Sequence, residues 1–127
     1  MRAATFTLLS TDAQLLSLGM TAASFLGTSA ADSPEMRPWA IIKWGQSTPA
    51  FGLTGETALE VWYYDEPGSY VRINKLIERT KSLLQDAVHV QGSDGDELTA
   101  ARWAGDSPEL YDDVFKCITR YTSFTVV

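Results

Sequence analysis

The strongest pattern in the chain is a helical spacing of apolar residues after residue 70. Apolar or small side chains recur at intervals of three and four, and charged side chains occupy the positions between them, as on a helix with one buried face. The expected buried face consists of Ile73, Leu76, Ile77, Thr80, Leu83, Leu84 and Ala87. Asp65–Gly68 has turn chemistry, and Ser69 is the expected N-cap. The pattern predicts a helix at Val71–Gln85 that lies on a sheet.

Alternating and β-rich segments predict the strands of that sheet. Residues 57–64 alternate strictly, so neighbouring side chains point to opposite faces. The two faces are Leu59, Val61 and Tyr63 on one side and Glu60, Trp62 and Tyr64 on the other. Residues 37–45 are rich in β-branched and aromatic side chains, with Pro38 at the first position, where a missing N–H is tolerated. Residues 98–104 and 114–127 are the other expected strands.

The N-terminal residues predict a second, shorter helical layer. Residues near helical spacing are Ala4, Leu8, Leu15 and Leu18. Thr11 with Gln14 matches a capping box, so one or two short helices that end at Gly19 are expected. Residues 21–26 are expected to form a short strand, and residues 27–35 a surface loop.

The order of these elements predicts an α+β fold. Helix, strand, strand, strand, helix, strand and strand follow one another with short links near residues 65 and 92. This order favours a single, mostly antiparallel sheet of four to five strands packed by two helices. Residues 46–56, which include Pro49, Gly52 and Gly55, are expected to be a loop. We expect one domain over residues 1–127.

Charge is distributed unevenly along the 127 residues, which carry 16 acidic and 10 basic side chains. Residues 86–113 hold eight of the acids and one base. A net charge of −6 without a lysine or arginine run argues against a surface that grips nucleic acid, because such binding is mainly electrostatic. The longest apolar run has four residues, whereas a bilayer span needs about twenty, so no membrane partner is expected.

Candidate catalytic residues are few. His89 is the only histidine and Cys117 the only cysteine, so an internal disulfide and a His-rich metal site are both excluded. Asp112 and Asp113 are adjacent, and adjacent side chains in extended structure point apart. Residues 92–97 resemble a calcium loop in composition, but the required alternation of ligands fails. We therefore expect no catalytic residue, no cofactor and no metal.

Large aromatic side chains gather on the predicted strands. They are Trp39, Trp44, Trp62, Trp103, Tyr63, Tyr64, Tyr111 and Tyr121. Because residues 57–64 carry large side chains on both faces, the second face either contacts another subunit or lies in a covered core, and both alternatives stay open. Phe51 adds a large apolar side chain to the expected loop. The expected subunit-interface residues are Phe51, Trp62 and Tyr64.

Five segments between residues 37 and 127 form a series of hydrophobic and turn motifs. They are RPWAIIKWG at 37–45, FGLT at 51–54, LEVWYYDEPGSY at 59–70, the helix at 71–85 and ARWAGDSPELYDDVFKCITRY at 101–121. In order and spacing the series resembles the tail terminator, or tail completion, proteins of long-tailed bacteriophages, particularly those of actinobacterial hosts. The first 36 residues match only as a helical segment.

The resemblance implies a virion protein and no enzyme. Such proteins form a ring, usually a hexamer, on the head-proximal end of the tail tube, where they stop tube polymerisation and offer a docking surface to the capsid neck. The implied partners are further copies of the chain, the tail tube protein and the head–tail connector of the neck. The implied location is the virion tail, after assembly in the host cytoplasm, and viral DNA passes through the ring without specific binding.

The acidic segment adds one expectation about that ring. The loop at residues 91–97, with Asp94, Asp96 and Glu97, is expected to face the ring opening, because negative charge does not hold passing DNA. A solvated loop on the outer rim is the alternative. The alternative functions are a neck or head-completion connector and a small hydrolase that uses His89.

Overall fold

The computed structural model describes residues 2–27, 37–50 and 53–127. Three α-helices are present in these residues, together with a short 3₁₀ turn and eight strands. The helices are α1 (Arg2–Ser10), α2 (Ala13–Ser17) and α3 (Val71–Asp86), with the 3₁₀ turn at Ala22–Ser24. The strands are β1 (Phe25–Leu26), β2 (Trp39–Ala50), β3 (Leu53–Asp65), β4 (Val90–Gln91), β5 (Glu97–Leu98), β6 (Ala101–Asp106), β7 (Leu110–Asp112) and β8 (Cys117–Val126).

Six of the strands form one sheet with the order β1-β2-β3-β8-β6, and β7 also pairs with β8. All of its pairings are antiparallel except that of β1 with β2. The predicted α+β class is confirmed, but the sheet has more strands than the four to five predicted and three helices accompany it rather than two. Strands β1 and β7, of two and three residues, are too short to show an alternating pattern in the sequence.

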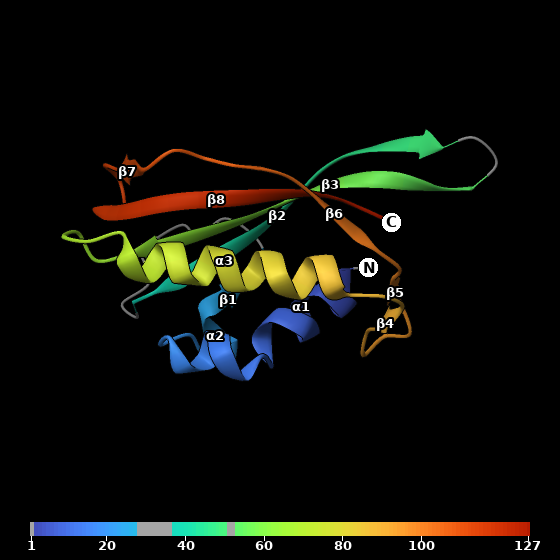
Figure 1. The fold of residues 1–127 in the computed structure, drawn as a ribbon, viewed down its shortest axis with the longest axis horizontal. Coiled ribbons are helices and arrows are strands. Elements are labelled where there is room, and N and C mark those ends of the chain that lie inside the picture. Colours follow the sequence, from blue (N-terminus) through green and yellow to red (C-terminus); the bar gives the residue numbers. More distant parts are fainter. Residues whose placement is uncertain (1, 28–36, 51–52) are drawn as a thin grey trace.

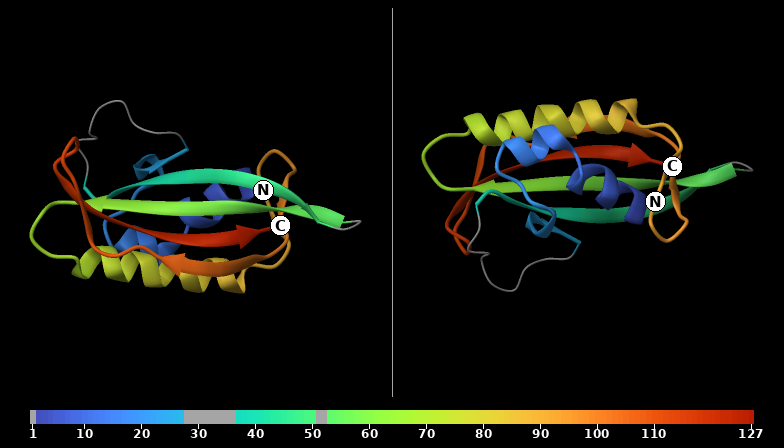
Figure 2. Two further views of the ribbon diagram at one scale, coloured as in Figure 1. Left: turned by 90° about the horizontal axis from the view of Figure 1, so that it is seen from above. Right: turned by 90° about the horizontal axis from the view of Figure 1, so that it is seen from below.

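The helices all lie on one face of the sheet. Figure 1 shows α3 along the length of the sheet, with α1 and α2 beyond it, and the left view of Figure 2, from above, shows the opposite face of the sheet with no helix in front of it. We call the helix-covered face the inner face and the opposite one the outer face. A sheet covered on one side buries alternate residues of each strand, which explains why the alternation in residues 57–64 was so clear.

The inner core joins β3 to α3. Leu59, Val61 and Tyr63 of β3 are fully buried, and the predicted face of α3 is buried at Ile73, Leu76, Ile77, Thr80 and Leu84. The Thr80 hydroxyl donates to the Leu76 carbonyl at 2.8 Å, so the Tyr63 hydroxyl, 2.5 Å from Thr80 Oγ1, is the donor of the second bond. Burial raises the pKa of Tyr63.

The Asp12 carboxylate links the start of α2 to α3. Asp12 accepts a hydrogen bond from the Leu15 backbone N–H at 3.0 Å and so caps α2, whereas the sequence predicted Thr11 in that role. Thr11 instead donates its hydroxyl to the Thr7 carbonyl at 2.6 Å. The Arg79 guanidinium donates two further bonds to Asp12, at 2.8 and 3.0 Å. The bonds from Arg79 hold the Asp12 carboxylate at the start of α2, where it caps the helix.

Local hydrogen bonds shift the bounds of several predicted elements. The 3₁₀ turn replaces most of the strand predicted at residues 21–26, because Ser24 Oγ accepts from the Thr21 N–H at 3.1 Å. Strand β8 begins at Cys117 rather than residue 114. The Asp112 carboxylate accepts from the backbone N–H groups of Val114 and Phe115, at 2.9 and 2.8 Å, which holds these residues in a turn. Helix α3 begins at Val71 as predicted, but its N-cap is Tyr70 and not Ser69; Ser69 Oγ accepts from the Val71 N–H one residue before the cap.

The loop predicted at residues 46–56 is wrong, because the described part of this segment is a β-hairpin. Strands β2 and β3 stay paired past Ser47–Thr57, at Thr48 with Glu56 and at Ala50 with Leu53, beyond the body of the sheet. Strand β8 supports β3 only as far as the pair Thr57–Val126. Beyond that point the hairpin has two strands and projects from the sheet (Figure 1). We call this extension, residues 47–56, the arm.

The proline and glycine residues of the arm favour a loop by sequence, but the position of Pro49 in the sheet tolerates a strand. Pro49 lies at a shift in the register between β2 and β3, on a part of β2 that pairs only with β3 in the described residues. An edge position of this kind does not need the missing proline N–H, so the residue does not end the strand.

Replacement of Asp12 should loosen α2. We expect Asp12→Ala to lower the free energy of unfolding by about 1 kcal/mol at neutral pH, since the helix loses its cap. The hydrogen bonds from Arg79 hold the pKa of Asp12 below its ordinary value of 3.8. The stabilisation is therefore present above pH 3.8 and disappears as the pH falls through the lowered pKa of the folded state.

Urea denaturation at neutral and acid pH tests this expectation. Asp113→Ala, at an exposed aspartate in the turn before β8, is the control and should behave as the unchanged chain does. A deficit in Asp12→Ala that stays constant down to pH 2 contradicts the assigned role of the carboxylate.

Candidate assembly surfaces

The outer face of the sheet carries an aromatic cluster near the start of β8. The Trp39 and Tyr64 rings stack with centroids 4.2 Å apart, and Phe115 meets Trp39 edge-on at 5.2 Å. Ile41 and Cys117 complete this buried group. The aromatic rings thus build a second small core on the face that has no helix.

Two of the predicted interface residues take different positions in this cluster. Tyr64 is only 3% exposed, so its ring is covered within its own subunit and offers no contact surface. Burial raises the pKa of Tyr64 to about 12. Trp62 is half-buried, lies 4.4 Å from the Tyr121 ring and has the Lys43 ammonium 4.2 Å above it. Trp62 therefore keeps an accessible edge, and Phe51 lies outside the described residues.

The hairpin of β4 and β5 holds the three acidic residues predicted to face a ring opening. The Asp96 carboxylate accepts from the backbone N–H groups of Ala3 and Ala4, each at 3.0 Å, and so binds the start of α1. Gly92 makes this contact possible, because a Cβ there would meet the Ala4 nitrogen at 2.7 Å. The hairpin is therefore tied to α1, contrary to the prediction of a flexible loop, and Asp94 is its exposed acid.

His89 has a partner that the sequence did not reveal. Its Nδ1 lies 2.9 Å from Glu97 Oε1, and its side chain is 66% exposed. Cys117, the only thiol, is buried and donates to the Phe115 carbonyl at 3.3 Å. Burial raises the pKa of the Cys117 thiol, which keeps it protonated. The two residues lie toward opposite ends of β8, which is ten residues long, so they do not form one site.

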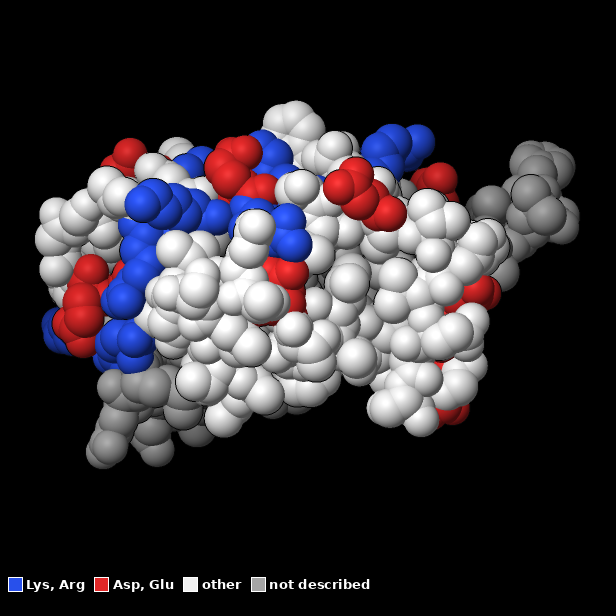
Figure 3. Space-filling model, turned by 60° about the horizontal axis from the view of Figure 1, so that its bottom comes forward, with Lys and Arg blue, Asp and Glu red and all other residues white. Residues whose placement is uncertain are grey.

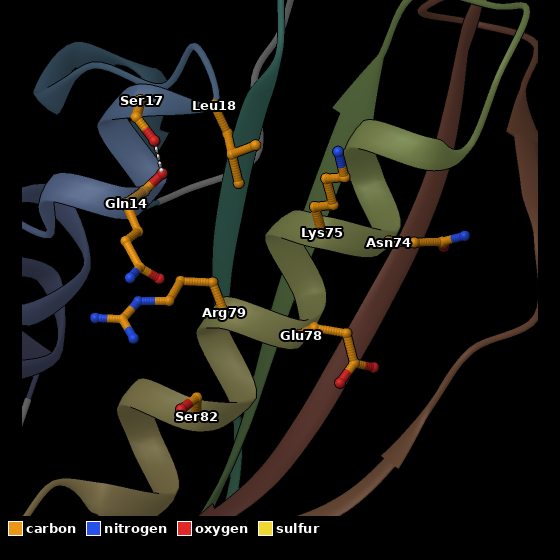
Figure 4. Close-up of a pocket in the computed structure, with 8 residues that line it drawn as sticks. All are labelled: Gln14, Ser17, Leu18, Asn74, Lys75, Glu78, Arg79 and Ser82. Atoms are coloured by element: carbon orange, nitrogen blue, oxygen red, sulfur yellow. Dashed lines mark hydrogen bonds between the residues drawn. The ribbon is translucent and has the colours of Figure 1, made fainter.

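A groove of about 560 Å³ runs between α2 and α3. Its lining residues are Gln14, Ser17, Leu18, Asn74, Lys75, Glu78, Arg79 and Ser82. Figure 4 shows the Asn74 and Glu78 side chains pointing away from α2, and Arg79 is already bound to Asp12. A small-molecule site needs polar groups that converge on a common point. The polar groups of this groove do not converge in this way.

A smaller hollow of about 380 Å³ lies between α1 and the part of β2, around Ile42 and Trp44, that pairs only with β3 in the described residues. Arg2, Ala3, Phe6, Gly27, Ile42 and Trp44 line it. The Arg2 guanidinium lies over the Trp44 ring, 5.3 Å from its centroid. Phe6 is one of the more exposed large apolar side chains of the described residues, so the hollow has an aromatic rim open to contact.

The described residues contain no group of three or more histidine, cysteine, aspartate or glutamate side chains placed to hold a metal ion. In the same part of the chain, no helix has both the length and the apolar character needed to cross a membrane. Neither a protein-family model nor a curated protein matches this chain. Its surfaces are therefore interpreted from their own geometry.

The outer cluster should stabilise the subunit itself. We expect Tyr64→Ala to lower the free energy of unfolding by about 3 kcal/mol, because a buried ring and its stack on Trp39 are lost. Tyr111→Ala, the same change at a ring that is 52% exposed, is the control and should stay within about 0.5 kcal/mol of the unchanged chain. Equal losses in chemical denaturation of the two variants contradict the assignment of Tyr64 to a core.

Proposed function

We propose that this protein is a tail terminator of a long-tailed bacteriophage. It forms a ring, a hexamer by the resemblance, on the head-proximal end of the tail tube, where it stops tube growth and receives the capsid neck. Its partners are copies of itself, the tail tube protein and the neck connector. Its place is the virion, and it is made and assembled in the host cytoplasm.

The observation that carries the proposal is the arm. A hairpin of two strands is marginally stable by itself in water, and the arm receives no third strand from the described residues of its own subunit. A neighbouring chain can provide the missing support. An extension of this kind has a clear use in an assembly protein and none in the core of its own subunit.

The two edges of the sheet support a ring rather than a two-fold dimer. At one edge, β2 pairs with β1 only at Ala40 and Ile41. At the other edge, β6 is the last strand of the sheet and carries exposed Arg102 and Trp103. The two edges are unlike, and a closed ring of more than two copies needs contacts between unlike surfaces.

The segments that carry the resemblance fall mostly on the main part of the fold. The matching segments between residues 37 and 127 correspond to β2, β3, α3 and β6–β8, which are the main sheet and its longest helix. In the proposed ring, Asp94 is the acid of the hairpin best placed to repel DNA, since Asp96 is engaged with α1.

Electron microscopy of the purified protein tests the proposal. We expect rings with a central opening, and rings on one end only of tail tubes to which the protein is added. Particles that stay single at every concentration contradict the ring. Rings that bind empty capsids but ignore tubes identify a neck connector instead.

Phe51, the large apolar residue of the predicted 46–56 loop, should contribute to assembly. We expect Phe51→Asp to reduce the fraction of protein in rings while leaving the melting temperature unchanged, because the acid must be desolvated at a contact. Val88→Asp, at a side chain that is 67% exposed between α3 and β4, is the control and should assemble normally. Sedimentation velocity measures both, and normal assembly of Phe51→Asp excludes this residue from the contact.

The residues that first suggested chemistry should not matter for assembly. We expect the double variant His89→Gln with Cys117→Ser to form rings and to stop tube growth, with a modest loss of stability because a hydroxyl replaces a buried thiol. The measurement is tube length by electron microscopy. Tubes of uncontrolled length, with the variant still folded, contradict a purely structural role for these two side chains.

A further inference from the structure

The N-terminal layer of the molecule is almost free of charge. Residues 3–27 contain one charged side chain, Asp12, and that carboxylate is 9% exposed and bound by Arg79. In Figure 3 the lower central surface, over α1 and α2, is white, whereas lysine and arginine gather to its left and above it. Phe6 and Leu16 add two exposed apolar side chains to this layer, each 39% exposed.

The arm has the same character. The segment from Trp44 to Gly55 contains no charged residue, although charged residues make up 20% of the chain. It includes Pro49, Ala50, Phe51 and Leu53. Apart from Glu56 at its base, this projecting hairpin is uncharged by sequence, and its β2 strand has no second neighbouring strand there in the described residues, which favours contact with another surface.

The hollow beside Phe6 is the surface in this chain that suits such a hairpin. It lies between the uncharged layer and that part of β2, and aromatic side chains form its wall. Its charged lining residue, Arg2, is placed over Trp44. The uncharged part of the arm, residues 47–55, can cover this hollow without removing water from an unpaired ion, which is the main cost of burying charged surface.

We propose that the arm of one copy of this chain lies in the hollow between α1 and β2 of the next copy. The inference rests on the proposed function and gives it a contact: an extension on each subunit enters a different surface on its neighbour. The subunit's own arm leaves the sheet along the strand direction, away from the body (Figure 2), so a second copy is the occupant. Repetition of this contact between unlike surfaces closes a ring.

Three variants test the contact by sedimentation velocity. Phe6→Glu places a charge in the hollow, and an arm-shortened chain joins Ser47 to Thr57 through Asn-Gly, a turn that suits a two-residue hairpin. Leu16→Glu is the matched control, since Leu16 has the same exposure as Phe6 but does not line the hollow. We expect monomers from the first two variants and normal assembly of the control.

Mixing the two defective variants gives the sharper test. The arm-shortened chain keeps an intact hollow and Phe6→Glu keeps an intact arm, so an equimolar mixture should form one-to-one dimers that neither variant forms alone. Circular dichroism and melting curves establish that each variant is folded. Normal assembly of either variant, a mixture that stays monomeric, or an unchanged chain that is itself monomeric overturns the inference.

The proposed function can fail independently of this contact. If the chain forms rings through the arm but the rings bind no tail tube, the contact stands and the tail terminator role fails. If rings cap tubes while Phe6→Glu and the arm-shortened chain both assemble normally, the role stands and the contact lies elsewhere.

Discussion

The two-sided pairing of β3 is the constraint on which the rest of the structure depends. From Thr57 to Tyr64 it lies between β2 and β8, so its side chains must fill a core on each face of the sheet. On the inner face Tyr63 reaches Thr80 of α3, and on the outer face Tyr64 stacks on Trp39. Because both faces of one strand are buried, the orientation of α3 and the position of the outer cluster are set together.

Carboxylates attach the N-terminal layer to this framework. Asp12 connects the cap of α2 to α3, and Asp96 connects the β4–β5 hairpin to the start of α1. A carboxylate at a helix start satisfies N–H groups that have no partner inside the helix. These contacts use charges that would otherwise face water, and they leave a surface over α1 and α2 that is nearly neutral. Asp96, predicted from the sequence to face the ring opening, thus also holds the hairpin to α1.

An assembly role suits the features that the fold does not use. The arm, the hollow beside Phe6 and the accessible edge of Trp62 contribute little to the core of the subunit, and each presents apolar surface. The proposed ring gives the first two a common purpose. Figures 1 and 2 place the arm at one end of the sheet, so contact with a neighbour leaves the inner core undisturbed.

The sequence by itself determined the α+β class, the buried face of α3 and the alternation of β3, because helical and strand periodicities are local and each is repeated over several residues. It also indicated the aromatic outer face, but not that Tyr64 is buried while Trp62 keeps an open edge. Only the tertiary structure decided the arm, since its strands are held by pairing across the hairpin despite Pro49. The Asp96–Ala3 and Asp12–Arg79 contacts join residues 93 and 67 positions apart, and no local pattern encodes such a distance.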